Sequence, residues 1–216
     1  MNNFLEVFLK NRSALLKAVF EHLQVSFSAV AIGILIAVPL GIILTRYPKV
    51  GKKALAALGV LQTVPSMVMF GILLPVSGIG RNTAMIVLSI YSILPILRNT
   101  YTGISEVPDN YLEAAAGMGM NSFQKLVRVE LPIALPVIIT GIRLSSVYII
   151  SWATVAAIIG GGGLGDIIYM GLSRYNHAMV LLGAIPASLL AILTSFVIGQ
   201  IAKLATPRGM RRGKNG

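Results

Sequence analysis

The sequence predicts an all-α, polytopic membrane protein, on the basis of its composition and of how its apolar residues are arranged. Of the 216 residues, 56% are hydrophobic and only 12% are charged, and the mean hydropathy is +0.82. A soluble domain carries about twice this share of charged residues. The apolar residues are also concentrated in long runs that short polar segments separate. Lipid, rather than water, is therefore the expected surrounding of most of the chain.

Five apolar runs are long enough to cross a membrane as helices, since a span requires about 20 residues. They are residues 23–44, 54–76, 83–104, 133–159 and 178–202. Prolines occur inside these runs, among them Pro39, Pro65, Pro95 and Pro186. Each proline removes a backbone donor and favours a kink, so we expect bent helices.

The segment before the first run, residues 1–21, mixes large apolar side chains with charged ones. This pattern is typical of an amphipathic helix on a membrane surface, and a frayed polar leader explains it equally well. The first run is too long for the core of a signal peptide, so we expect it to remain in the protein.

Basic residues cluster in two places beside the apolar runs. They are Arg46, Lys49, Lys52 and Lys53 after the first run, and Lys203, Arg208, Arg211, Arg212 and Lys214 after the last. With five spans, both clusters lie on the same side of the membrane as the polar residues 106–132. The positive-inside rule places that side in the cytosol and the N-terminus outside.

The expected organisation is an external amphipathic segment at 1–21, a transmembrane domain at 22–204 with a cytosolic loop at 106–132, and a basic cytosolic tail at 205–216. The formal net charge of +11 would suggest nucleic acid in a soluble protein. Because these charges flank apolar runs, we expect the lipid bilayer, and no nucleic acid, as the partner. The chain has no cysteine, which excludes disulfides and thiolate metal sites.

The loop at 106–132 is the main polar break between the predicted spans. Helix-forming residues precede Gly119, and either Asn121 or Ser122 can cap a helix that comes after it. We therefore expect two short helices that meet at a glycine turn. A solvated loop whose alanines merely favour helix is the alternative.

The loop also carries a spaced motif: Glu113-Ala114-Ala115, then Gly119, then Leu131-Pro132. This skeleton resembles the EAA loop of the transmembrane subunits of ABC importers, with Val129 where that family has isoleucine. The resemblance implies a five-helix, type I (MetI-like) ABC importer core with its N-terminus outside.

By this resemblance, the first loop helix binds a cytosolic ABC ATPase, which binds ATP and Mg²⁺, so that this chain needs no cofactor of its own. Glu113 would stabilise the loop or pair with a basic group, and Ala114 and Ala115 would allow close approach. Gly119 would make the turn, and Pro132 would start the next span. A second permease subunit, identical or paralogous, and an external substrate-binding protein complete the implied complex.

A glycine-rich segment lies after the fourth predicted span. Its glycines are Gly160, Gly161, Gly162, Gly163 and Gly165. Such a loop can bind phosphate, but a nucleotide-binding loop needs a subsequent Lys-Ser/Thr pair that is absent here. The predicted orientation also places the segment outside, so a flexible or re-entrant external turn is the better interpretation.

Candidate residues for the translocation path are Gln62, Ser66, Tyr148 and Trp152. Trp152 is the only tryptophan and lies deep in the fourth span. Aromatic faces attract cations, so a cavity lined by Tyr148 and Trp152 would suit a quaternary amine. The alternative is that the small polar side chains hold helices together and that Trp152 simply packs.

No enzyme active site can be assembled from the sequence. His22 and His177 are the only histidines, and no acidic residue lies within a predicted span. Neither a metal site nor a catalytic triad is expected, and proton-coupled transport, which needs an ionisable relay at membrane depth, is disfavoured. The chain is therefore predicted not to be an enzyme.

Segments 62–67, 94–103 and 152–165 resemble the permeases of osmoprotectant importers. The predicted function is thus the permease subunit of an ATP-driven importer for glycine betaine, carnitine or choline, in the bacterial cytoplasmic membrane, which moves solute by alternating access. One alternative is the same architecture with another solute such as methionine. The other is an ATPase-independent channel or membrane scaffold.

Overall fold

The computed structural model describes residues 4–205, and all regular secondary structure in this part of the chain is helical. Four helical segments in it are long and apolar enough to span a membrane. Three of them are α1 (Phe4–Thr45), α4 (Arg81–Ser105) and α9 (His177–Ala205), and the fourth, Ser122–Ile159, contains α7 (Leu131–Ala156). A bent pair, α2 (Pro48–Thr63) and α3 (Ser66–Ser77), is the fifth candidate. The predicted all-α membrane fold is confirmed.

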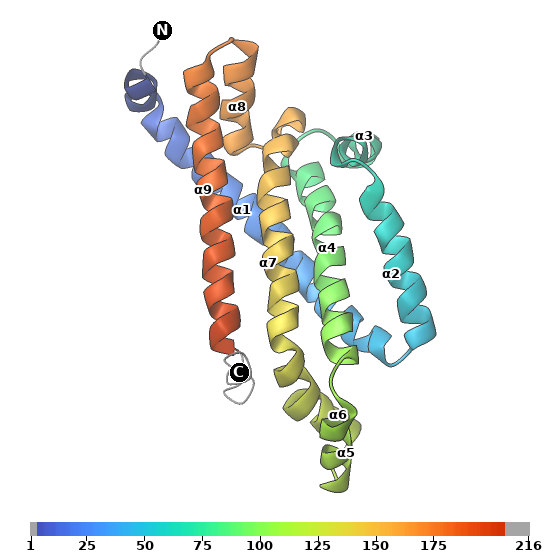
Figure 1. Ribbon diagram of the computed structural model, residues 1–216. Coiled ribbons are helices and arrows are strands. Elements are labelled where there is room, and N and C mark those ends of the chain that lie inside the picture. Colours follow the sequence, from blue (N-terminus) through green and yellow to red (C-terminus); the bar gives the residue numbers. More distant parts are fainter. Residues whose placement is uncertain (1–3, 206–216) are drawn as a thin grey trace.

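The helices form a bundle with α4 packed between α1 and α7, while α9 packs on α7 (Figure 1). The start of α1 and the short helix α8 (Leu164–Ser173) lie at one end. At the other end lie α5 (Asp109–Gly117), α6 (Ser122–Lys125), the connection from α1 to α2 and the end of α9. The described parts of the segments predicted to share one side of the membrane therefore do share one end of the bundle.

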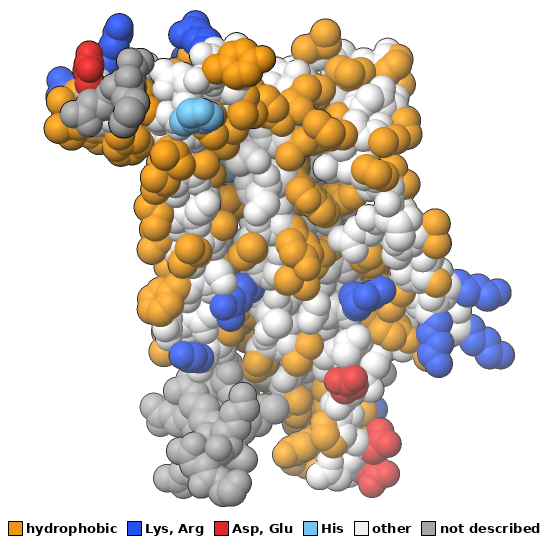
Figure 2. All heavy atoms as spheres, turned by 45° about the horizontal axis from the view of Figure 1, so that its top comes forward, with side chains coloured by type: hydrophobic (Ala, Val, Ile, Leu, Met, Phe, Trp, Pro, Cys, Tyr) orange, Lys and Arg blue, Asp and Glu red, His pale blue; other side chains and the backbone are white. Residues whose placement is uncertain are grey.

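Apolar side chains cover much of the surface between these ends (Figure 2). Leu35, Ile192 and Leu193 are examples, with exposed fractions of 74%, 64% and 56%. On the face that Figure 2 shows, acidic side chains lie only at the two ends. This distribution is that of a protein whose middle is surrounded by lipid.

The first helix runs without a break from Phe4 to Thr45, so residues 4–21 are not a separate helix. Val7, Leu15 and Ala18 pack with buried residues of α8 and α9. The other sides of this segment expose large apolar residues, including Phe20. The predicted basic tail lies, from residue 206 onward, outside the described residues.

The second predicted span is two helices rather than one kinked helix. α2 and α3 meet at an angle of 93° around Val64 and Pro65. A residue before proline is confined to extended conformations, and Val64 has φ −65° and ψ 125°. The Tyr91 hydroxyl donates to the Val64 carbonyl over 2.5 Å and so satisfies an acceptor at the helix break.

Small polar residues connect the central helices. The Ser92 hydroxyl donates to the Ala29 carbonyl of α1 (3.1 Å) and also to the Ser89 carbonyl of its own helix (2.7 Å). The Ser145 hydroxyl of α7 donates to the Ser92 carbonyl (3.0 Å). All three serines are buried, and such contacts hold membrane helices together.

Candidate functional site

The loop between α4 and α7 contains both predicted helices and the predicted turn. α5 ends in a Schellman motif, in which Gly119 N–H donates to the Ala116 carbonyl (2.9 Å) and Met120 N–H to the Ala115 carbonyl (3.1 Å). Gly119 has φ +77°, in the left-handed region that glycine adopts most readily. The motif glycine therefore stands where the turn requires it.

The second loop helix begins at a capping box. The Asn121 side chain accepts from Gln124 N–H (2.9 Å), and the Gln124 side chain accepts from Asn121 N–H (3.0 Å). α6 then continues through a π-helical turn, η1 (Leu126–Glu130), into α7, with Pro132 in the first turn. The loop is thus joined to α7 by continuous helix.

The motif residues of α5 differ in their exposure. Ala115 is buried, at 1% exposed, whereas Glu113, Ala114 and Gly119 are exposed. Within residues 4–205 Glu113 makes no ion pair, so the basic partner that the resemblance implied for it is not found within this part of the chain. The exposed face of α5 is free for contact with another molecule.

Three large apolar side chains beside the motif are also exposed. Tyr111, Met118 and Phe123 have exposed fractions of 50%, 69% and 73%. They lie on α5, on its terminal turn and on α6. We call them the loop patch. Exposed apolar groups rimmed by polar residues mark sites of protein contact. Sequence reasoning missed them, although their position beside the motif was a usable signal.

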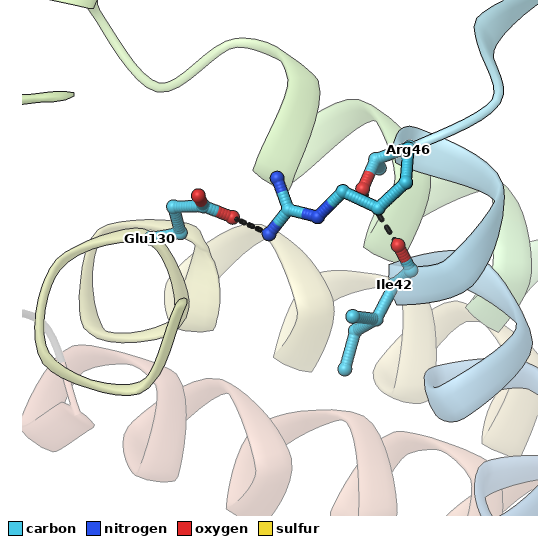
Figure 3. Close-up of polar contacts among 4 residues, drawn as sticks. Ile42, Arg46 and Glu130 are labelled. Atoms are coloured by element: carbon cyan, nitrogen blue, oxygen red, sulfur yellow. Dashed lines mark hydrogen bonds and ion pairs between the residues drawn. The ribbon is translucent and has the colours of Figure 1, made fainter. Parts of the chain in front are cut away.

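The ion pair of this loop is formed by Glu130, not by Glu113. Nη2 of Arg46 donates to Oε2 of Glu130 over 2.5 Å (Figure 3). Arg46 comes directly after the last residue of α1. The pair thus links the end of the first long helix to the start of α7.

The two aromatic candidates for the path lie together, with a third that sequence reasoning did not select. The rings of Tyr148 and Trp152 are stacked, with centroids 5.8 Å apart. Tyr91 meets Trp152 edge to face at 4.7 Å. Tyr148 is 41% exposed and Trp152 is half-buried. Only contact between α4 and α7 reveals Tyr91, because 61 positions (152 − 91) separate it from Trp152.

The other two candidates lie near this cluster in the bent pair. Gln62 lines a shallow open pocket between α2 and α4, which Tyr91 also lines. Ser66 is the first residue of α3, just after the Pro65 break. The bend of 93° therefore brings the candidate residues of α2 and α3 toward the aromatic residues of α4 and α7.

The glycine-rich segment is a packed turn. After α7 and the 3-10 turn η2 (Ala157–Ile159), Gly160 adopts φ +77°, and Gly163 lies against the buried His22 of α1. A Cβ atom at Gly165 would lie 2.2 Å from the Thr154 carbonyl oxygen. Partial burial, and secondarily the charge of Glu21, raise the pKa of Asp166.

No group of three His, Cys, Asp or Glu side chains among the described residues is arranged to hold a metal ion. What the fold does present is a bundle of membrane-length helices with an exposed helical loop at one end and an aromatic cluster between its helices. These features define the class: a multi-pass membrane protein that presents a helical loop at one end of its bundle.

Residues 29–210 match the model of the family described as the inner membrane component of binding-protein-dependent transport systems, and the chain belongs to this family. Members of this family are the non-enzymatic permease components of ABC transporters, in which a separate subunit hydrolyses ATP. The predictions of permease function, of no enzymatic activity and of a multi-pass protein in the bacterial cytoplasmic membrane are confirmed.

Relatives match along the whole chain. The carnitine transport permease protein OpuCB of Listeria monocytogenes is 45% identical over 216 residues, which are 100% of this chain and 99% of the relative. The choline transport system permease protein OpuBB of Bacillus subtilis (strain 168) is 43% identical over 214 residues, 99% of each chain.

Solved structures resemble the fold. A chain of the MetNI methionine ABC transporter in an inward-facing conformation matches with a TM-score of 0.82 at 22% identity. The match covers 89% of this chain and 96% of that one. At this level of identity the likeness concerns the type I permease fold alone.

Proposed function

We propose that this chain is the permease subunit of an ATP-driven importer for quaternary-amine solutes, with glycine betaine, carnitine and choline as its substrate class. The observation that carries this proposal is identity of 45% and 43% along the whole chain with a carnitine and a choline permease. A relative for glycine betaine, carnitine and choline in Bacillus subtilis is 42% identical over 211 residues.

The aromatic cluster supports this substrate class on chemical grounds. A quaternary ammonium has no N–H to donate, so hydrogen bonds cannot recognise it, whereas an aromatic face attracts it electrostatically. Tyr148 and Trp152 offer two stacked rings with centroids 5.8 Å apart, and Tyr148 is half-exposed. In our proposal these rings line the path, with Gln62 and Ser66 on the bent pair beside it.

The loop patch and the exposed face of α5 dock a cytosolic ABC ATPase in this proposal. Tyr111, Met118 and Phe123 supply apolar contact, and Glu113 supplies a charge at its edge. Ala114 allows close approach, while Ala115 packs inward. The ATPase binds ATP and Mg²⁺, a second permease subunit completes the pathway, and an external substrate-binding protein delivers the solute.

Uptake measurements test the substrate class. The chain, co-expressed with its ATPase, its partner permease and its binding protein in a bacterial strain that lacks osmoprotectant uptake, should restore accumulation of radiolabelled glycine betaine, carnitine or choline. Trp152→Leu should reduce this uptake by about thirtyfold, because a cation–π contact in a desolvated site is worth about 2 kcal/mol. Trp152→Phe keeps a ring and should lose less.

Methionine import is the competing function, suggested by the fold of the methionine transporter. The same strain, also deleted for methionine uptake, separates the two. Methionine accumulation without accumulation of any quaternary amine would show the substrate class to be wrong while leaving the permease assignment intact.

A further inference from the structure

Glu130 is the only Asp, Glu, Lys or Arg among the described residues that is buried, at 5% exposed. It ends the π-helical turn η1 and directly precedes Leu131 and Pro132 of the loop motif. A buried carboxylate is costly unless a cation compensates for its lost hydration. Arg46 supplies this cation at 2.5 Å.

Arg46 is fixed to the end of α1. Its own N–H donates to the Ile43 carbonyl (3.0 Å), and the Thr45 hydroxyl donates to the Ile42 carbonyl (2.7 Å). The backbone from which the guanidinium extends is therefore hydrogen-bonded to the last turn of α1. The ion pair joins residues 84 positions apart in the sequence.

The two long helices are connected to the loop in different ways. α5 and α6 contact η1, and η1 continues into α7 without a break. A displacement of α5 thus reaches η1 through packing contacts, and α7 through the hydrogen-bonded helix that continues from η1. α1 has no such continuity with the loop. Among side-chain hydrogen bonds of the described residues, the one between Arg46 and Glu130 is the only one that ties α1 to residues 106–132.

The π-helical turn determines where Glu130 points. Hydrogen bonds from i to i+5 accommodate one more residue than an α-helical turn, and such turns often occur at functional sites. An extra residue rotates the next part of the helix by about 100° about its axis. With η1 in place, Glu130 faces the end of α1, where Arg46 lies.

We propose that Arg46 and Glu130 are positioning residues that pass the displacement of α5 to α1, so that α1 and α7 move together when the ATPase closes. This inference rests on the proposed docking of the ATPase on α5. Without the pair, the ATPase still binds and hydrolyses ATP, but α1 moves less closely with the loop and less solute crosses per ATP.

The test uses the complete transporter, purified with its ATPase, its partner permease and its binding protein, in proteoliposomes. Uptake of the best quaternary-amine substrate among glycine betaine, carnitine and choline is divided by ATP hydrolysed. The variants are Arg46→Gln, Glu130→Gln and the double variant. Lys52→Gln, an exposed basic residue of the same region with no ion pair in the described part of the chain, is the control.

Both single variants should transport about tenfold less solute per ATP, within the range typical of coupling between sites, while Lys52→Gln should match the wild type. The double variant shows whether the ion pair transmits the displacement or only stabilises the fold, because it leaves no charge buried without a partner. The double variant should be present in the membrane in the same amount as the wild type and should still transport about tenfold less solute per ATP. If both the amount in the membrane and the solute transported per ATP equal those of the wild type, the proposal is overturned.

Arg46→Lys provides an independent measurement in which the charge remains. Because the Arg46 guanidinium donates a single hydrogen bond to Glu130, the ammonium group of a lysine can donate in its place. Solute per ATP should stay above half of the wild-type value, and a loss as large as that of Arg46→Gln would overturn the proposal. A wild-type complex without ATP-dependent uptake would instead refute the proposed function.

Discussion

The same type of turn, with glycine in the left-handed position, ends a helix at each end of the bundle. Gly119 ends α5 and Gly160 ends the extension of α7, and both have φ +77°. Each turn closes with the two hydrogen bonds of a Schellman motif, at distances between 2.9 and 3.1 Å. The backbone geometry is the same, so any difference in role comes from the surroundings.

The surroundings are opposite. A Cβ atom at Gly119 would meet no atom within 4 Å, whereas one at Gly161 would lie 2.7 Å from the Ala156 carbonyl oxygen and one at Gly165 would lie 2.2 Å from that of Thr154. At Gly119 the sequence needs glycine only for its backbone, and the turn leaves a free surface for a partner. The segment after Gly160 needs glycine for space, because it holds α7 against α8.

Gly165→Ala should have the largest effect, since the new methyl group would also lie 2.5 Å from the Ala157 Cβ. Backbone must shift to accept it, and overpacking of this kind costs about 3 kcal/mol. We expect a clear fall in the thermal midpoint of the detergent-purified chain and less protein in the membrane.

Gly71→Ala is the matched control for this prediction. Gly71 lies inside α3, and a Cβ atom there would meet nothing within 4 Å. Alanine is favoured over glycine in a helix by about 1 kcal/mol, so this variant should be at least as stable as the wild type. Equal thermal midpoints for the two variants would contradict the distinction between the packed and the open turn.

Gly119→Ala should have an intermediate effect that comes from the backbone alone. An L-residue with left-handed φ costs about 1–2 kcal/mol, and no steric clash adds to it at this position. Gly119→Asn should cost less, because asparagine tolerates this conformation. Amide hydrogen exchange of Gly119 and Met120 in the wild type, compared with the same positions in the two variants, measures the opening of this turn. If the alanine and asparagine variants lose protection from exchange equally, the space around the side chain, and not the backbone angle φ, restricts this position to glycine.

Tyr175→Gly should give a smaller change, of the opposite sign. Tyr175 occupies the corresponding position of a third turn, after α8, with φ +50° and 91% exposed. Glycine removes strain of about 1–2 kcal/mol but makes the unfolded chain more flexible by about 0.5–1 kcal/mol. The net gain, between about 0 and about 1.5 kcal/mol and centred at about 0.75 kcal/mol, should raise the thermal midpoint slightly. Tyr175→Ala, which removes the ring without relieving φ, should show no gain.

These turns show what sequence can and cannot predict. The helix at α5, the turn at Gly119 and the cap at Asn121 result from local chemistry. The helix and the turn were predicted correctly, and Asn121 was one of the two residues predicted as the cap. The partner of Glu130 was not predicted, because it depends on the meeting of segments 84 positions apart. Tyr91 was missed for the same reason, since its role depends on contact with Val64 and Trp152. The break at Pro65 was expected as a kink, and its size depends on how α2 and α3 pack.

Glu113→Gln should affect stability least and partner binding most clearly. Its side chain is exposed and makes no ion pair with residues 4–205, so the free energy of unfolding should change by no more than about 0.5 kcal/mol. If the open turn presents α5 to the ATPase, affinity of the purified ATPase for the permease in nanodiscs should fall by about tenfold, or about 1.4 kcal/mol.

Glu6→Gln is the control, because it removes another exposed carboxylate at the opposite end of the bundle. It should change neither the free energy of unfolding nor the ATPase affinity. A Glu113→Gln variant that loses stability but keeps its ATPase affinity would mean that Glu113 supports the loop internally, and the contrast between the open and the packed turn would then be structural only.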